Sequence, residues 1–262
     1  MSIAQRNNVQ VHGHGPATIV FAHGFGCDQN MWRLLAPQYA ERFRVVTFDH
    51  VGSGSSDLSA YDRAKYDSLG GYAQDLVEIA REYGSGPVIV VGHSVSAMIG
   101  LLASVGSPGV IAAHIMIGPS PCYINDGDYV GGFSRADIDS LLDTLDSNYL
   151  GWASAMAPAI MGAPDRPALG QELTNSFCAT DPEIAKHFAR VTFLSDNRAD
   201  VPKLATRALV IQCSDDIIAP LSVGEYLHAT LPDSELRIVD NIGHCPHLSA
   251  PIPIRDAMNA FL

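Results

Sequence analysis

The sequence predicts an α/β fold, in which a mostly parallel sheet carries helices on both faces and a helical insertion interrupts the later part of the chain. Strand-like and helix-like runs alternate, as they do in parallel sheets joined by crossover helices. Several strand-like runs are continuously apolar, such as Val88–Val91, which is typical of strands buried on both faces. The alternation stops between about Pro119 and Pro202, where only helix-like runs occur.

The expected core elements follow from short β-rich runs and from apolar residues at helical spacing. The expected strands are Val9–His12, Ala17–His23, Arg44–Asp49, Pro87–His93, Ile111–Gly118, Arg207–Cys213 and Glu235–Asp240. The expected helices are Met31–Tyr39, Ser68–Tyr83, Val95–Val105, Leu221–Leu231 and Ile254–Leu262.

Four further helices are expected in the insertion. The first opens with the capping-box pattern Ser134-x-x-Asp137, and the others carry apolar residues at helical spacing from about Tyr149, Pro167 and Thr180 onward. We therefore divide the chain into an α/β core, residues 1–118 and 203–262, and a helical insertion, residues 119–202. The insertion holds twelve acidic and five basic residues.

Charge and cysteine content exclude several classes of partner. The 262 residues include 28 acidic and 16 basic side chains, for a net charge of −12. A net negative charge repels polyphosphates and anionic lipids. We therefore expect that the protein binds neither nucleic acid nor a membrane surface. Five scattered cysteines without C-x-x-C spacing indicate free thiols in a reducing compartment. With no apolar run of membrane length, we expect a cytoplasmic protein.

The strongest sign of chemistry is Gly92-His93-Ser94-Val95-Ser96, which stands between an apolar strand and a helix. This strand–turn–helix context is the one in which the G-x-S-x-G motif presents a nucleophilic serine on a sharp turn. Residue 96 is Ser where the motif has Gly, and it is still small enough for the turn. The alternative is a chance Gly-x-Ser turn, which the context disfavours.

A serine hydroxyl needs a base, and the base needs an acid that orients it. The segment Gly243-His244-Cys245-Pro246-His247 follows the last strand, and His244 is the better base because it follows a flexible glycine. His247 is the competitor, and the H-x-x-H spacing could instead indicate a metal pair, although no third ligand stands nearby. The acid is expected after strand 207–213, at Asp215 or Asp216.

Stabilisation of an oxyanion requires backbone N–H groups aimed at the developing charge. One is expected from Val95, which follows the serine. The other is expected from Phe25, between two glycines in the loop after strand 17–23. A second glycine-rich stretch, residues 49–55, resembles a phosphate loop only superficially, since no Lys follows it. We interpret it as a structural turn capped by Asp49.

Four longer strings resemble one subfamily of α/β-hydrolases, which contains the bacterial stress regulator RsbQ and the plant strigolactone and karrikin receptors. They are residues 25–29 (FGCDQ), 92–100 (GHSVSAMIG), 118–123 (GPSPCY) and 243–249 (GHCPHLS). The resemblance covers essentially the whole chain. It implies a V-shaped helical lid over a deep apolar pocket, with Ser94, Asp216 and His244 at its base and no cofactor or metal. It selects Asp216 as the acid, four residues before Pro220.

The resemblance also implies which residues line the pocket. These are Phe25, His93, Tyr123, Phe133, Trp152, Met156, Phe177, Phe193 and Ile217. The expected function is a serine hydrolase that acts on a small apolar ester or butenolide-type lactone. The alternatives are a slow-turnover sensor that engages a regulatory partner protein through the lid, and carbon–carbon bond hydrolysis or perhydrolysis on the same triad. We expect a monomer or a weak dimer.

Overall fold

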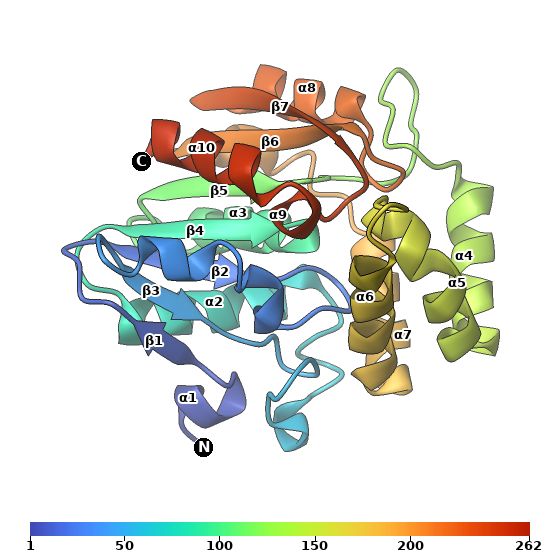
Figure 1. Cartoon of the computed structure of the whole chain (residues 1–262), viewed down its shortest axis with the longest axis horizontal. Coiled ribbons are helices and arrows are strands. Elements are labelled where there is room, and N and C mark those ends of the chain that lie inside the picture. The colour runs from blue at the N-terminus through green and yellow to red at the C-terminus, as the bar shows by residue number, and fades with distance from the viewer.

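The computed structural model describes residues 1–262 and contains one seven-stranded sheet (Figure 1). The strand order is β1-β3-β2-β4-β5-β6-β7. Only β1 runs antiparallel to its neighbour β3, and the other pairs are parallel. The strands are β1 (Gln10–His12), β2 (Thr18–Ala22), β3 (Arg44–Thr47), β4 (Val88–His93), β5 (Ala113–Ile117), β6 (Arg207–Asp215) and β7 (Ser234–Ile242). Each predicted strand is therefore present, with ends that shift by a few residues.

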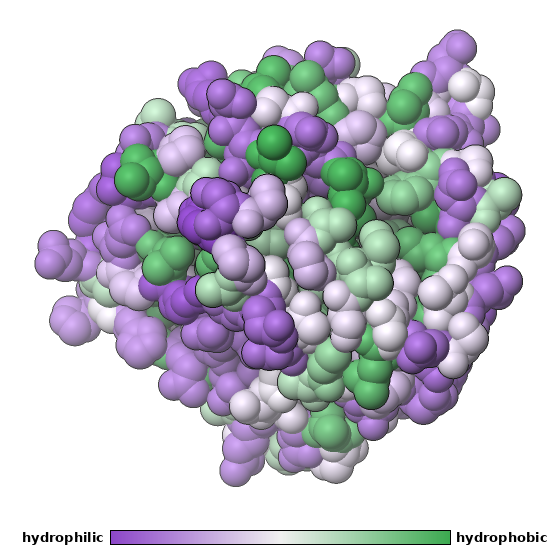
Figure 2. All heavy atoms as spheres, turned by 45° about the vertical axis from the view of Figure 1, so that its right-hand side comes forward, coloured by the Kyte–Doolittle hydropathy of each residue, from purple (hydrophilic) through white to green (hydrophobic).

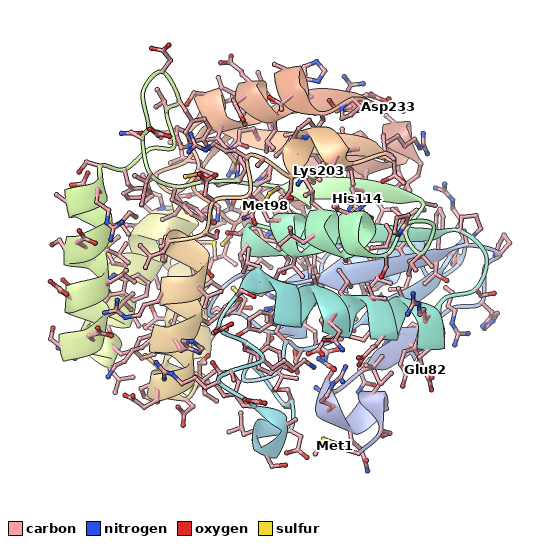
Figure 3. All side chains as sticks on the ribbon, turned by 180° about the vertical axis from the view of Figure 1, so that it is seen from behind. Met1, Glu82, Met98, His114, Lys203 and Asp233 are labelled. Carbon is pink, nitrogen blue, oxygen red and sulfur yellow. The ribbon has the colours of Figure 1, made fainter.

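Helices cover both faces of the sheet, as predicted. One face packs against α2 (Leu69–Tyr83), α3 (Val95–Gly106) and α8 (Leu221–Thr230), whose apolar residues share a core with β4 (Figure 3). The opposite face packs against α10 (Pro251–Phe261) and the segment around Trp32 (Figure 1). The parallel strands thus present their carboxyl ends along one edge, where ligands bind in open α/β sheets.

One predicted helix is wrong. In place of a helix over Met31–Tyr39, the chain forms two short 3₁₀ helices, η1 (Gln29–Trp32) and η2 (Ala36–Tyr39). Pro37 lies in the first turn of η2, and because proline has no N–H it cannot continue an α-helix that began upstream. Four other short elements were not predicted: α1 (Ile3–Arg6), η3 (Leu58–Ala60), η4 (Val201–Lys203) and α9 (Pro246–Ser249).

The insertion forms the four predicted helices, which stand beyond the carboxyl ends of the strands (Figure 1). They are α4 (Arg135–Ser147), α5 (Tyr149–Met161), α6 (Pro167–Ala179) and α7 (Pro182–Phe193). The capping box of Ser134 and Asp137 is present at the start of α4. A separate apolar cluster fills the space between these helices and the core. The residue boundaries of a core and a lid domain stay a prediction.

The surface on the side of the insertion is mixed in character. Figure 2 shows apolar and weakly polar side chains near the middle of this face and hydrophilic side chains around its margin. None of the helices has both the length and the apolarity that crossing a membrane requires.

Candidate active site

Ser94 occupies a strained turn between β4 and α3. Its backbone has φ +56° and ψ −125°, and Asn8 is the only other non-glycine residue with positive φ. Such strain persists only where the surrounding structure imposes it. A side chain on Gly92 would lie 2.6 Å from the main chain of Ser96, so the turn requires glycine there. This is the geometry of a nucleophile elbow, which exposes the serine hydroxyl at the end of the strand.

Ser94, His244 and Asp216 form one hydrogen-bonded series. The Ser94 hydroxyl lies 2.8 Å from His244 Nε2, and His244 Nδ1–H donates to Asp216 Oδ2 at 2.7 Å. The side chains come from three segments far apart in sequence, and their exposed fractions are 5%, 4% and 7%. A carboxylate in this position holds the imidazole in the tautomer whose Nε2 accepts the serine proton. The arrangement is that of a Ser-His-Asp hydrolase triad.

The structure separates the two candidate acids. Asp216 is buried, and its second oxygen accepts from the N–H groups of Ile218 at 2.8 Å and Ala219 at 3.2 Å. Asp215 is exposed, and its main-chain oxygen accepts from Gly243 N–H at 2.8 Å. Asp216 therefore faces His244, whereas Asp215 contributes only its backbone to the loop that carries His244.

The loop after β2 brings Phe25 toward the elbow. Gly26 has φ +70°, which favours glycine, and the Phe25 N–H donates to no acceptor in the protein. Val95 is the first residue of α3, so its N–H belongs to the first helical turn, where donors lack intrahelical partners. The two N–H groups assigned to an oxyanion hole from sequence are therefore both available for one.

Ser96 has a role that sequence reasoning missed. Its hydroxyl donates to the main-chain oxygen of His23 and accepts from His50 Nε2 at 2.8 Å, while His50 N–H donates to His23 Nε2 at 3.1 Å. Burial lowers the pKa of His50 well below its usual value, so the ring is neutral. The hydroxyl thus ties the elbow to the start of the Phe25 loop, which the glycine of the general motif could not do.

The glycine-rich stretch 49–55 is a structural turn, as interpreted from the sequence. The Asp49 carboxylate accepts from Ser55 N–H at 2.9 Å and from Gln29 N–H at 2.8 Å. A side chain on Gly54 would lie 2.5 Å from the Asp49 carboxyl carbon. Because the carboxylate fills the space that a phosphate would need, this turn has no anion-binding role.

Ser94 and His244 lie at the floor of an apolar pocket. The space between its walls, including the mouth that opens to solvent, is about 420 Å³. Aromatic side chains form much of the wall. The Trp152 ring stacks on the Phe177 ring at a 12° interplanar angle, and the centroids of the Phe25 and Phe177 rings lie 5.8 Å apart. The lining residues are Phe25, Cys27, His93, Ser94, Tyr123, Trp152, Ile160, Leu173, Phe177, Thr192, Phe193, Ile218, His244 and Cys245.

Three of the expected pocket residues lie elsewhere. Ile217 is 48% exposed, whereas its neighbour Ile218 is 6% exposed and lines the pocket. The chain bends after Asp216, whose carboxylate accepts from the Ile218 N–H, and this turn leaves Ile217 at the surface while Ile218 faces the pocket. Phe133 and Met156 are half-buried against the apolar cluster of the insertion instead. The resemblance assigns these three residues to the pocket by position alone, which does not distinguish the pocket wall from packing nearby.

Burial shifts the pKa values of other titratable side chains around the pocket. It raises the pKa of the Cys27 and Cys245 thiols, which makes both poor nucleophiles beside Ser94. It lowers the pKa of His247 to about 3, so that ring is neutral, and its centroid lies 4.8 Å from Trp32 and 4.4 Å from His93. No group of three or more His, Cys, Asp or Glu side chains gathers in a way that could hold a metal ion.

Comparison with known proteins identifies the class. Residues 19–257 match the alpha/beta hydrolase family, and the chain belongs to that family. The resemblance of the sequence motifs to α/β-hydrolases is thereby confirmed.

Within this family, the chain is similar over nearly its whole length to particular proteins. The chain is 37% identical to the karrikin insensitive 2 receptor CA of Petunia hybrida over 95% of this chain and 93% of the relative. It is 38% identical to the strigolactone esterase D14 of Arabidopsis thaliana, over 95% and 94%. The solved structure of a hydrolase from Oleispira antarctica is 42% identical, with a TM-score of 0.94 over 99% of this chain and 96% of that one.

Proposed function

We propose that this protein hydrolyses small, apolar, uncharged esters or lactones through an acyl-enzyme on Ser94. The observation that carries the proposal is the hydrogen-bonded series from Ser94 through His244 to Asp216 at the floor of an apolar pocket. Relatives named strigolactone esterase and karrikin insensitive 2 receptor support the same substrate class.

The proposed reaction has two halves. Ser94 Oγ attacks the carbonyl carbon while its proton passes to His244 Nε2, and Asp216 stabilises the imidazolium. The Phe25 and Val95 N–H groups hold the negative oxygen of the tetrahedral intermediate. The C–O bond then breaks, and the alkoxide takes the proton from His244. Water, deprotonated by His244, attacks the acyl carbon, and the bond from that carbon to Ser94 Oγ breaks as Oγ takes the proton back from His244 and the acid leaves.

The pocket and the insertion together favour neutral substrates. Ten of the fourteen lining residues are hydrophobic, and the rings of Phe25, Trp152 and Phe177 pack against one another in the wall. The acidic residues of the insertion repel anions that approach the mouth. Short acyl groups are therefore preferred over long or charged ones.

The experiment compares p-nitrophenyl acetate, butyrate, octanoate and hemisuccinate for the wild type and for Ser94→Ala. The wild type should hydrolyse acetate and butyrate fastest, and Ser94→Ala should lose ~10³-fold or more in kcat with an unchanged melting temperature. Near wild-type rates in Ser94→Ala would overturn the serine mechanism. Faster turnover of octanoate or hemisuccinate would overturn the substrate class.

A second candidate function is a ligand sensor that turns over slowly and engages a regulatory partner at the insertion. The relatives named as receptors favour it. A sensor should hydrolyse a butenolide at well under ~1 s⁻¹, below the usual range for enzymes, and the lactone should shift the melting temperature of the whole protein. Fast turnover without a shift in melting temperature would favour a metabolic enzyme over a sensor. A cytoplasmic location and a monomer or weak dimer remain part of this proposal.

A further inference from the structure

His93 directly precedes the serine, yet its imidazole bonds to the loop of the catalytic histidine rather than to the serine. The ring is 2% exposed, and Nε2–H donates to the main-chain oxygen of His244 at 2.7 Å. The two residues are 151 positions apart in sequence. This contact links the elbow and the His244 loop without passing through the triad side chains.

The main chain of His244 depends on such contacts. Gly243 before it has φ +103°, which favours glycine, and its N–H donates to the Asp215 oxygen at 2.8 Å. The His244 N–H donates to the Ile160 oxygen at 2.7 Å, and its carbonyl oxygen accepts from His93. His93 is the only side chain that bonds to the backbone of His244.

The orientation of the His93 ring is tightly determined. The ring packs so closely on Gly24 that a Cβ atom there would lie 2.6 Å from His93 Nδ1. Among its other contacts, the centroids of the His93 and His247 rings lie 4.4 Å apart. A carbonyl oxygen only accepts, so Nε2 carries the proton and Nδ1, which has no partner, is bare. Burial, with neighbouring histidines, lowers the pKa of His93 well below its usual value, so this neutral tautomer persists.

We propose that His93 is a positioning residue for the hydrolysis, because its Nε2–H holds the His244 main chain where the imidazole reaches Ser94. This inference rests on the proposed function. It differs from the expectation that His93 acts by contacting substrate, since a substrate contact changes KM, whereas a misplaced base lowers kcat. A shift of about 1 Å in a reacting group can cost ~10²-fold in rate.

The test compares His93→Met, which keeps the bulk and removes the donor, with His93→Gln, which keeps an N–H donor. We expect kcat to fall ~10- to 100-fold in His93→Met with KM within about two-fold, and His93→Gln to recover most of the loss. His114→Met is the matched control, because His114 is equally buried but bonds to Ser104 at 2.8 Å on the face covered by α3 (Figure 3). It should lose stability and keep the wild-type kcat.

A raised KM with unchanged kcat in His93→Met, or no recovery in His93→Gln, would overturn the proposal. Ser94→Ala is measured alongside, and if it retains activity the proposed function fails, whatever His93 does. Nitrogen-15 NMR of the wild type provides a test that needs no variant to fold. The His93 ring should be the Nε2–H tautomer, and an Nδ1–H tautomer would overturn the proposal, because Nε2 could then donate no hydrogen bond.

Discussion

Asp215 and Asp216 are neighbours in the chain, but their carboxylates meet different surroundings. Asp216 is buried against His244 Nδ1 at 2.7 Å, and Asp215 faces solvent. The residues alone left this choice open, and the likeness to a family resolved it in favour of Asp216. The roles of His93 and Ser96 were not predictable, because each depends on contacts between segments that are distant in sequence.

Asparagine substitution distinguishes the two acids. Asp216→Asn should lower kcat by up to ~10⁴-fold, because the amide stabilises the wrong histidine tautomer. Asp215→Asn is the matched control, and it should cost under ~10-fold, which corresponds to about 1 kcal/mol of disturbance. Both rates are measured on p-nitrophenyl acetate. The reverse ranking would show that the acid is Asp215.

Helices α5 and α6 do more than cover the pocket, because each contacts one catalytic loop. The end of α5 accepts the His244 N–H at Ile160, and α6 donates from the Ser176 hydroxyl to the Gly26 oxygen at 2.9 Å. The helices themselves were predictable from apolar spacing, capping residues and Pro167. Their contacts to the loops were not, since helical periodicity shows which face is apolar but not what that face meets.

The Ser176 contact is testable against a serine on the neighbouring helix. Ser176→Ala frees the loop that carries Phe25, so kcat should fall ~3- to 10-fold, the value of one net hydrogen bond of about 1 kcal/mol. Ser154→Ala is the control, because Ser154 is exposed and its hydroxyl bonds only within α5, to Leu150 at 2.9 Å. Steady-state kinetics should show no change there. Equal losses in the two variants would contradict a role for α6 in holding the loop.

Across the whole molecule, buried neutral histidines make the fold sensitive to acid. Burial lowers the pKa of His114 to about 4 and of His247 to about 3, and it lowers those of His23, His50 and His93 as well. Between the usual value of 6.5 and these lowered values, the unfolded chain binds protons that the folded chain does not. Stability therefore falls as pH drops through this window.

Urea unfolding at pH 6 and pH 5 measures this effect. The wild type should lose several kcal/mol between the two, at about 1.4 kcal/mol per pH unit for each such histidine. His114→Gln removes one of these groups, so its free energy of unfolding should depend on pH less steeply by about that amount. A pH dependence equal to that of the wild type would contradict the view that His114 is neutral in the fold.

The general architecture was predictable because a parallel sheet, its crossover helices and the motif loops each carry local signals. Strand ends, the 3₁₀ turns around Pro37 and the pocket wall were less so, since they depend on packing between distant segments. The central claim is narrower than the architecture. It is that the Ser94 hydroxyl, activated by His244, is the nucleophile.

Labelling with a fluorophosphonate tests that claim most directly. The activated serine oxygen should displace fluoride and form a bond to phosphorus, which mimics the tetrahedral intermediate. Intact mass and peptide mapping should show one adduct per chain, on the peptide that contains Ser94, together with loss of esterase activity. Ser94→Ala should remain unlabelled. An adduct on another residue, or full esterase activity without any adduct on Ser94, would contradict the account.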